Sequence, residues 1–204
     1  MKRLIFLLLL PSTLLQAQVF DIALGGGIAM GQIDGDNSGH YNHIGYQAGI
    51  ATSFPLGNEN GWRMVVELGV ILKGAEVNNS SLQGRTISLH YVHLPLLLTY
   101  TIDIGRYKHL RLGAGLAPAF LYHAHVDDDG VNNPLQVANF RKLDLLPFCT
   151  EARMMLSRHW GVSLRYYNSL RTIAKESGTG TYRLVRSNTG IFNNNLSAAV
   201  VFLF

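Results

Sequence analysis

The chain has 204 residues, which is enough for one domain or at most two small ones. It contains 17 Lys and Arg residues and 13 Asp and Glu residues. We expect Lys2 and Arg3 to be removed with a leader, which leaves a net charge of about +2. A charge this small does not indicate a nucleic-acid partner. Hydrophobic residues make up 48% of the sequence and charged residues only 15%, a balance that is unusual for a soluble protein. Cys149 is the only cysteine, which excludes an intramolecular disulfide and a cysteine-based zinc cluster.

The first residues, MKRLIFLLLLPSTLLQAQ, have the layout of a secretory signal peptide. Lys2 and Arg3 form a positive start, Leu4 to Leu10 form an apolar core, and Ala17 provides a small residue before Gln18. The apolar run is too short to cross a bilayer as a helix. We therefore predict a signal peptide over residues 1–17 and a single exported domain over residues 18–204.

The remaining sequence alternates between apolar and mixed positions with a period of two residues, which is the pattern of β-strands. In residues 62–74, for example, one parity is purely apolar while the other mixes charged residues with glycine. A strand that crosses a membrane needs about 9 to 11 residues. The pattern predicts eight long strands, at about 19–33, 43–55, 61–75, 86–102, 107–124, 143–157, 159–173 and 192–204.

The predicted connections alternate between long and short, as they do in outer-membrane barrels. Residues 34–42, 76–85, 125–142 and 174–191 form the long connections, and residues 56–60, 103–106 and 158 form the short ones. In lipid every backbone amide needs a partner, so a sheet must close on itself. We therefore predict an all-β fold, an eight-stranded antiparallel transmembrane β-barrel with up-and-down topology. Its apolar parity would face lipid, its mixed parity would face the lumen, and both termini would be periplasmic.

Three stretches carry a resemblance to a known family. They are YVHLPLLLTY (91–100), LRLGAGLAPAFLY (110–122), and VSLRYYNSLRTI (162–173) followed by NNNLSAAVVFLF (193–204). In this order they resemble the PorT-like outer-membrane β-barrels of Gram-negative bacteria, also called the porin family. The likeness runs from about residue 19 to the end, although LLPFCTEARMML (145–156) lacks the Gly-x-Gly usual in the sixth strand.

The resemblance implies a location in the bacterial outer membrane, with membrane lipid and the barrel-assembly machinery as partners and no cofactor. The founding member of the family is linked to the assembly of a protein-secretion machine, so an envelope protein is a further candidate partner. A shared fold by itself does not determine function.

Several charged residues fall on the parity that we expect to face the lumen. A charge buried without a partner costs several kcal/mol, so we expect these side chains to pair. One interpretation is a structural ion-pair network that fills the barrel, and the other is a gate in a narrow ion path. We favour the network, because eight strands leave little open lumen. The residues are Glu67, Lys73, Arg111, Glu151, Arg153 and Arg165.

The segment HAHVDDD (123–129) places His123, His125 and Asp127 on one parity at the entry to the third long connection. Such a set is a candidate transition-metal site. A single strand rarely supplies a full coordination shell, so we expect a solvated loop stem and no bound metal.

A catalytic barrel would need a nucleophile, a base and an orienting group at one place. Ser88 and His90 lie together on the fourth predicted strand, but no G-x-S-x-G element occurs, and both share the parity that faces lipid. We predict a non-enzymatic protein with a structural or interaction role, whose extracellular loops are the contact sites. The alternatives are a narrow channel and a lipid-modifying barrel enzyme.

The sequence ends on an aromatic residue within a predicted strand. Leu196, Ala198, Val200, Phe202 and Phe204 share one parity, and this last strand would close the ring against the first one. We expect Phe204 to anchor the strand at the interface. By resemblance to outer-membrane proteins generally, Phe204 also looks like the membrane-insertion signal that the assembly machinery reads.

Overall fold

The computed structural model describes residues 20–34, 41–57, 61–79, 82–106, 108–128, 131–132, 139–144, 147–174 and 191–204. The predicted signal peptide, residues 1–17, lies outside the described residues. Within the described part of the chain, no helix is long and apolar enough to cross a membrane.

All of the regular elements among the described residues are strands. They are β1 (Asp21–Asp34), β2 (His43–Pro55), β3 (Trp62–Asn79), β4 (Leu82–His93), β5 (Leu96–Asp103), β6 (His109–Leu116), β7 (Ala119–Asp128), β8 (Val131–Asn132), β9 (Leu143–Asp144), β10 (Pro147–Met155), β11 (Trp160–Ser169) and β12 (Phe192–Leu203).

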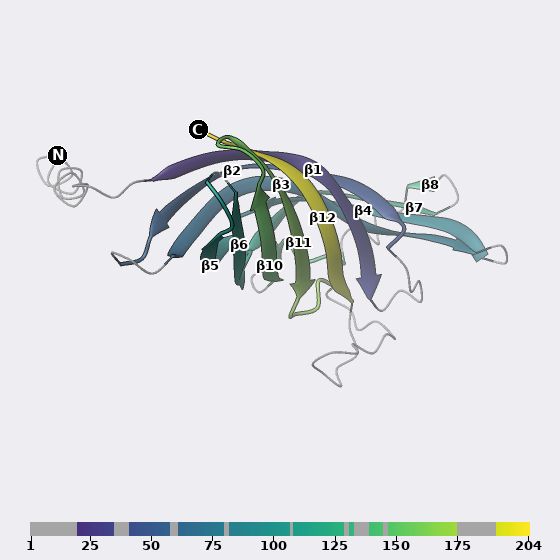
Figure 1. The fold of residues 1–204 in the computed structure, drawn as a ribbon. Helices are drawn as coiled ribbons and strands as arrows, with labels where there is room; N and C mark the ends of the chain where they lie inside the picture. Colours follow the sequence, from purple (N-terminus) through teal and green to yellow (C-terminus); the bar gives the residue numbers. More distant parts are fainter. Residues whose placement is uncertain are drawn as a thin grey trace, which may run out of the picture.

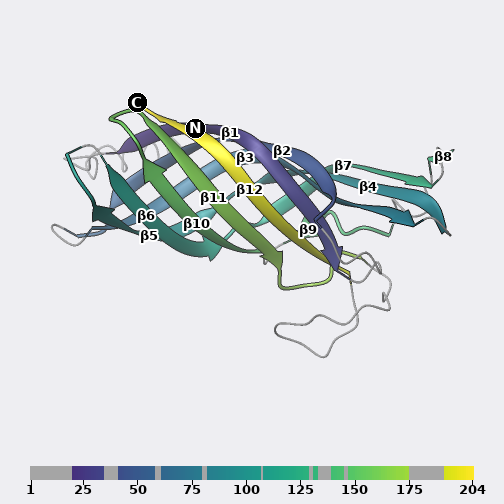
Figure 2. The ribbon, with the colours of Figure 1, turned by 45° about the vertical axis from the view of Figure 1, so that its right-hand side comes forward.

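The strands form one antiparallel sheet that closes on itself. β1 pairs with β2 and with the last strand, β12, and β3 pairs with β2, β4 and β5. β4 pairs with β7 and β5 with β6, and the ring continues from β6 through β10 and β11 to β12. The closing seam runs from Ala23 opposite Leu203 to Asp34 opposite Phe192. Figures 1 and 2 show β1 and β12 side by side along their length. The sheet therefore has no open edge along the seam.

Two prolines divide spanning strands into shorter elements. β4 and β5 meet at Leu94–Pro95, and β6 and β7 meet at Ala117–Pro118, because proline has no backbone N–H to donate to the ladder. Neighbouring backbone bonds bridge both breaks: Leu94 N donates to Pro118 O at 2.8 Å, and Glu67 N donates to Pro95 O at 3.0 Å. Counting β4 with β5, β6 with β7 and β9 with β10, eight strands span the barrel, and the predicted fold is confirmed.

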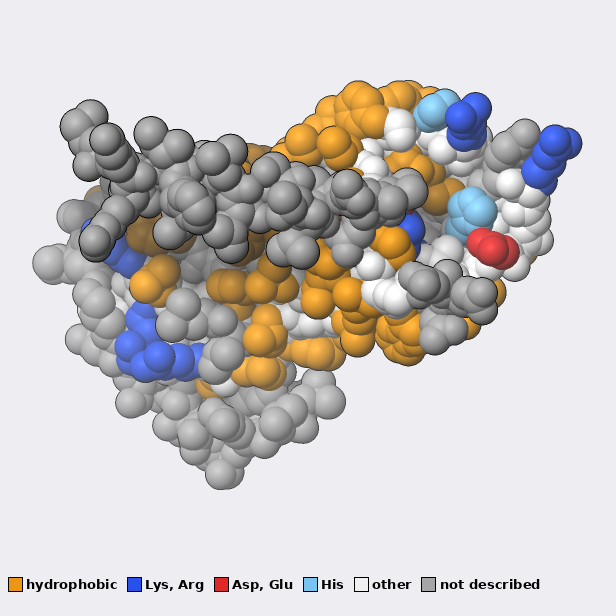
Figure 3. Space-filling model, turned by 90° about the vertical axis from the view of Figure 1, so that its left-hand side faces the viewer, with side chains coloured by type: hydrophobic (Ala, Val, Ile, Leu, Met, Phe, Trp, Pro, Cys, Tyr) orange, Lys and Arg blue, Asp and Glu red, His pale blue; other side chains and the backbone are white. Residues whose placement is uncertain are grey.

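The outward parity of the strands is apolar and the inward parity is mixed. In Figure 3, hydrophobic side chains occupy the middle of the described surface, and the larger groups of Lys and Arg side chains lie towards its two sides. In a soluble protein, so many apolar side chains exposed to water would favour aggregation, whereas in a membrane they contact lipid tails. Exposed members include Leu24, Ile28, Ile50, Leu68, Leu98, Leu112, Leu164 and Val200.

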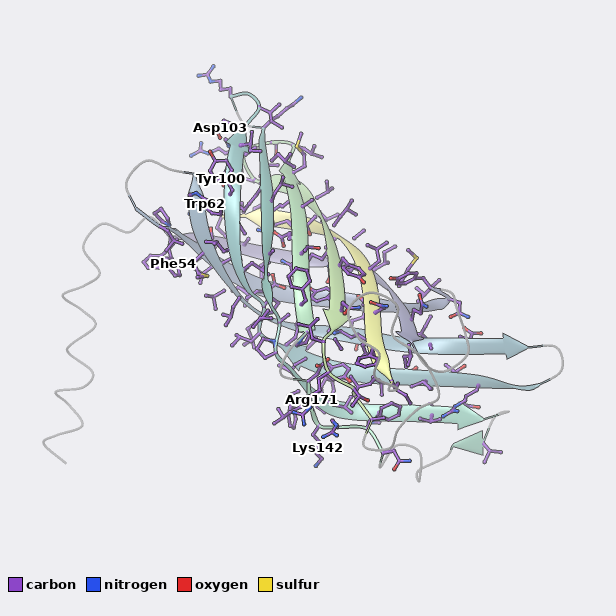
Figure 4. All side chains as sticks on the ribbon, turned by 90° about the horizontal axis from the view of Figure 1, so that it is seen from below. Phe54, Trp62, Tyr100, Asp103, Lys142 and Arg171 are labelled. Carbon is purple, nitrogen blue, oxygen red and sulfur yellow. The ribbon has the colours of Figure 1, made fainter. Side chains whose placement is uncertain are left out.

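The two ends of the barrel differ. We call the end that carries residues 56–57, 104–106 and 156–159 the turn end, and the opposite end the loop end. Phe54, Trp62 and Tyr100 lie towards the turn end, and Lys142 and Arg171 lie towards the loop end (Figure 4). The tips of β4, β7 and β8 project furthest from the C-terminus in both ribbon views (Figures 1 and 2).

One predicted connection is wrong. Residues 76–85 were expected to form a long loop, but β3 continues to Asn79 and β4 begins at Leu82. The paired register continues from Gly74 opposite Ser88 to Val77 opposite Arg85. Glu76 pairs with Thr86 in this register, so polar residues here lie on paired strands. The projecting parts of β3 and β4 are therefore paired strands.

Aromatic rings gather at the turn end, as expected for an interfacial girdle. The ring centroids of Trp62 and Tyr100 lie 5.1 Å apart, and those of Trp160 and Phe202 lie 4.9 Å apart. Phe204 follows the last strand, its ring lies 5.2 Å from that of Phe202, and its backbone N donates to Ile22 O at 3.0 Å. The C-terminal residue is thus attached to the first strand.

We expect Gly27→Ala to lower the free energy of unfolding by about 1–3 kcal/mol, because the added methyl group overpacks the closing seam. A Cβ at Gly27 would lie 2.0 Å from Ala198 O and 2.5 Å from Ala199 Cα, so β12 would have to shift. Gly25→Ala is the matched control on the same strand and face, since its nearest contacts would be 3.8 Å and 3.9 Å. Urea unfolding in lipid vesicles measures both variants. Equal midpoints for the two would contradict the close approach at the seam.

Candidate functional site in the barrel lumen

The centre of the lumen holds a cluster of four charges. Arg165 on β11 lies between Glu67 on β3 and Glu151 on β10. Its Nη1 donates to Glu67 Oε1 at 2.7 Å and its Nη2 to Glu67 Oε2 at 2.5 Å, which is a bidentate pair, and its Nε donates to Glu151 Oε2. Arg153 also pairs with Glu151, with 3.0 Å between Nε and Oε1. All four residues are buried, and two guanidinium groups balance two carboxylates. We call these residues the central cluster.

The opposite wall is made of small residues, which gives the long side chains of the central cluster room to extend. The inward positions of β1 and β2 next to the cluster include Gly25, Ala51 and Gly49, and a Cβ at Gly49 would lie 2.8 Å from Glu67 Oε1. The cavity left between this wall and the cluster has a volume of about 20 Å³. That is room for a single water molecule. At this level the lumen is therefore filled by side chains.

Lys73 lies in a separate environment nearer the loop end. Its side chain is 2% exposed, and its Nζ lies 5.4 Å from the ring centroid of Tyr91 and 5.2 Å from that of Tyr167. An ammonium group over aromatic rings is attracted by their negative faces. The lysine is thus stabilised by two rings, where the sequence suggested an ion pair.

Arg111 lies on the turn-end side of the central cluster, in register with Arg153, but it is not paired with either glutamate of the cluster. Its Nη2 is 3.7 Å from Asp21 Oδ2, and Arg63 Nη2 is 2.7 Å from the same oxygen. Arg111, Arg63, Asp21 and Arg153 line an open cavity of about 420 Å³, which we call the turn-end cavity. The structure thus distributes the six predicted lumen charges over three places.

Sequence reasoning omitted several partners of these charges. Tyr91 and Tyr167 share the lumen parity with Lys73, and Arg63 shares it with Glu67, so parity could have identified them. Asp21 is the first residue of β1, where the alternation has only just begun. Parity could not predict which of these side chains contact one another, because the partners come from different strands of the ring.

Three histidines near the loop end, His90, His123 and His125, lie on the outward face. His90 on β4 pairs in register with His123 on β7, and a bulge at this level leaves both Tyr122 and His123 exposed. The ring centroids of His90 and His123 lie 5.3 Å apart, and His125 Nε2 lies 3.9 Å from Asp127 Oδ2. The three candidates lie within β7 and not at a loop entry, because that strand continues to Asp128. Among the described residues, no group of three His, Cys, Asp or Glu side chains is arranged to hold a metal ion.

Comparison with known proteins identifies the family of the chain. A family model described as "Outer membrane protein beta-barrel domain" matches residues 16–175. No curated protein matches the chain.

Small outer-membrane barrels are among the similar solved structures. Ail, the attachment invasion locus protein of Yersinia pestis, is 11% identical, with 90% of this chain and 98% of that chain covered and a TM-score of 0.44. Neisserial surface protein A is 15% identical, with 93% and 100% covered and a TM-score of 0.48. OprG from Pseudomonas aeruginosa is 11% identical, with 92% and 97% covered and a TM-score of 0.46.

Proposed function

The chain belongs to the outer membrane protein beta-barrel domain family, and on that premise we propose that it is a non-enzymatic barrel with a closed lumen, which acts through the hairpins at its loop end. In this proposal the turn end and both ends of the mature chain face the periplasm, and the loop end faces the outside of the cell. Residues 1–17 are removed as a signal peptide. A link to a secretion or envelope assembly, with an envelope protein as partner, belongs to the same proposal.

The central cluster is the observation that carries the proposal. Arg165 joins β3 to β10 across the barrel, and the cavity between the cluster and the wall of β1 and β2 has a volume of about 20 Å³. A hydrated ion needs a wider path than one water molecule, so this level supports a closed lumen. A closed lumen excludes a pore function, so in this proposal the hairpins at the loop end are the contact surfaces.

The hairpins at the loop end support a contact role. The outward positions of β4 and β7 change from apolar residues, such as Val92 and Phe120, to polar ones, such as Ser88 and His125. This change indicates where the bilayer ends, so the remaining length of both strands would stand in water. His90 Nδ1 lies 3.3 Å from the hydroxyl of Tyr46 and is not engaged with Ser88, which supports a non-enzymatic role.

We expect the purified barrel to give no conductance steps in planar bilayers, because the central cluster fills the lumen. Glu67→Ala should show whether removing one carboxylate opens a path. The control is Arg158→Gln, which removes a charge in the short turn 156–159. Discrete steps in the wild type that Glu67→Ala alters and Arg158→Gln does not would replace our proposal with the narrow-channel alternative.

We also propose that Phe204 is read as the insertion signal by the barrel-assembly machinery. Deleting Phe204 should lower the amount of heat-modifiable barrel in the outer membrane several-fold, because the terminal ring and its bond to Ile22 are lost together. Phe204→Tyr keeps an aromatic ring and the backbone bond, so it should insert normally. Wild-type outer-membrane levels of the deletion variant would contradict this role.

A further inference from the structure

The turn-end cavity has the size of a ligand site and opens at the end opposite the projecting hairpins. Its volume of about 420 Å³ lies within the range of small-molecule pockets. Arg153 lines both this cavity and the small space beside the central cluster, so the buried cluster forms its floor. Trp62 lies at the rim, at the same end of the barrel as Asp103 (Figure 4). The central cluster therefore closes the cavity on its inner side.

The described residues that line the cavity carry more guanidinium groups than nearby carboxylates can satisfy. Arg153 is paired with Glu151 in the floor, which leaves Asp21 as the shared counter-ion of Arg63 and Arg111. Asp21 lies 2.7 Å from Arg63 but 3.7 Å from Arg111. Asp103, the other carboxylate on the lining, is mostly exposed and lies 2.7 Å from Nδ1 of His109.

Arg111 makes only long contacts within the barrel. Its Nε lies 3.4 Å from Thr101 Oγ1 and its Nη1 lies 3.4 Å from Ser53 Oγ, both beyond the usual range for such bonds. Its side chain is only 13% exposed, so water does not fully replace the missing partner. The result is one partly buried guanidinium group in a cavity without a close counter-ion.

We propose that the turn-end cavity binds a small organic anion through a carboxylate or phosphate group held by Arg111 and Arg63. The planar guanidinium fork matches both kinds of oxyanion with two parallel N–H···O bonds. One such group would supply the negative charge that Asp21 alone does not provide to two arginines. The apolar lining from Pro55, Met155 and Leu203 would contact the carbon skeleton of the ligand.

The chain provides its own reporter for this binding. It contains two tryptophans, and Trp62 lines the cavity while Trp160 does not. In a Trp160→Phe background, refolded in detergent micelles, Trp62 fluorescence would be followed during titration with succinate, with glycerol 3-phosphate and with uncharged glycerol. We expect saturable changes with at least one of the two anions and none with glycerol.

Two variants are expected to change the anion affinity in opposite directions, and a third is the control. Arg111→Gln should weaken anion binding by about tenfold or more, since a charged hydrogen-bonding partner is lost. Asp21→Asn should tighten binding, because it removes the competing internal carboxylate. Arg158→Gln, the matched control, removes the same charge from the same end of the barrel but outside the cavity lining, and it should leave binding unchanged. Heat-modifiable migration establishes that each variant is folded.

The outcomes separate the ligand classes. Binding of succinate alone identifies a carboxylate site, binding of glycerol 3-phosphate alone identifies a phosphate site, and binding of both shows a general oxyanion site. No saturable change with either anion at millimolar concentration would overturn the proposal. Equal affinities in Arg111→Gln and Arg158→Gln would also overturn it. If Arg111→Gln does not fold, Arg111→Lys keeps the charge, loses the fork and should still weaken binding.

Discussion

Replacing Arg165 by methionine is expected to lower the free energy of unfolding by about 3–5 kcal/mol, because it leaves a buried carboxylate without a counter-ion. In the wild type the central cluster contains two arginines and two glutamates. Without Arg165, Glu151 still pairs with Arg153, but Glu67 faces Gly49 and a nearly filled lumen. Methionine keeps much of the length and volume of the side chain, so the loss is mainly electrostatic.

The double variant Arg165→Met/Glu67→Gln separates the lost charge from the lost packing. Glutamine at position 67 carries no charge, so most of the stability should return while the Glu151–Arg153 pair remains. Arg158→Met, in an exposed turn, is the control and should change stability by less than about 0.5 kcal/mol. Urea unfolding in lipid vesicles, followed by tryptophan fluorescence, measures all three. A double variant no more stable than the single one would contradict an unpaired Glu67 as the cause.

Leu164→Arg is expected to destabilise the barrel by about 2–4 kcal/mol in lipid vesicles, the cost of a cation at the bilayer midplane. Leu164 lies near the middle of β11 and points outward, in register with Ala152 and Ala198. Its exposed fraction of 57% would make the change harmless in a soluble protein. The large effect thus arises only if lipid covers this face.

Leu156→Arg is the matched control for this prediction. Leu156 is 55% exposed, nearly the same as Leu164, but it lies in the turn 156–159, beyond the end of β10. A cation near the interface costs about 0–1 kcal/mol, so this variant should unfold close to the wild type. If both variants lose the same stability, the middle of β11 does not face the hydrocarbon core.

The strand framework could be predicted from the sequence because the two faces of a membrane barrel differ so strongly. The predicted strand 192–204 corresponds to β12 (Phe192–Leu203), and the predicted strand 43–55 corresponds to β2 (His43–Pro55). The strand prediction is wrong where the two faces of a strand no longer differ in polarity. Beyond the bilayer both faces of a hairpin can be polar, so the continuation of β3 and β4 past residue 75 was mistaken for a loop.

The candidate site was predictable in its members but not in its pairs. Glu67, Glu151 and Arg165 were placed in the lumen by parity alone, and all three are buried there. The same parity also included Arg111, which lies at the turn end with Asp21, and Lys73, which lies between two tyrosine rings. Period-two alternation fixes the direction of a side chain but not its height along the barrel relative to other strands.

By itself, the sequence determined that this chain forms eight long strands with one apolar face, and that the aromatic residue Phe204 follows the last of them. These properties follow from local alternation, which each strand carries within its own residues. Only the tertiary structure decided that Arg165 meets Glu67, 98 residues away, while Arg111 is left with a distant counter-ion in an open cavity. Those contacts cross the lumen between strands that are not neighbours, so they depend on the register of the whole closed ring, which no single strand encodes.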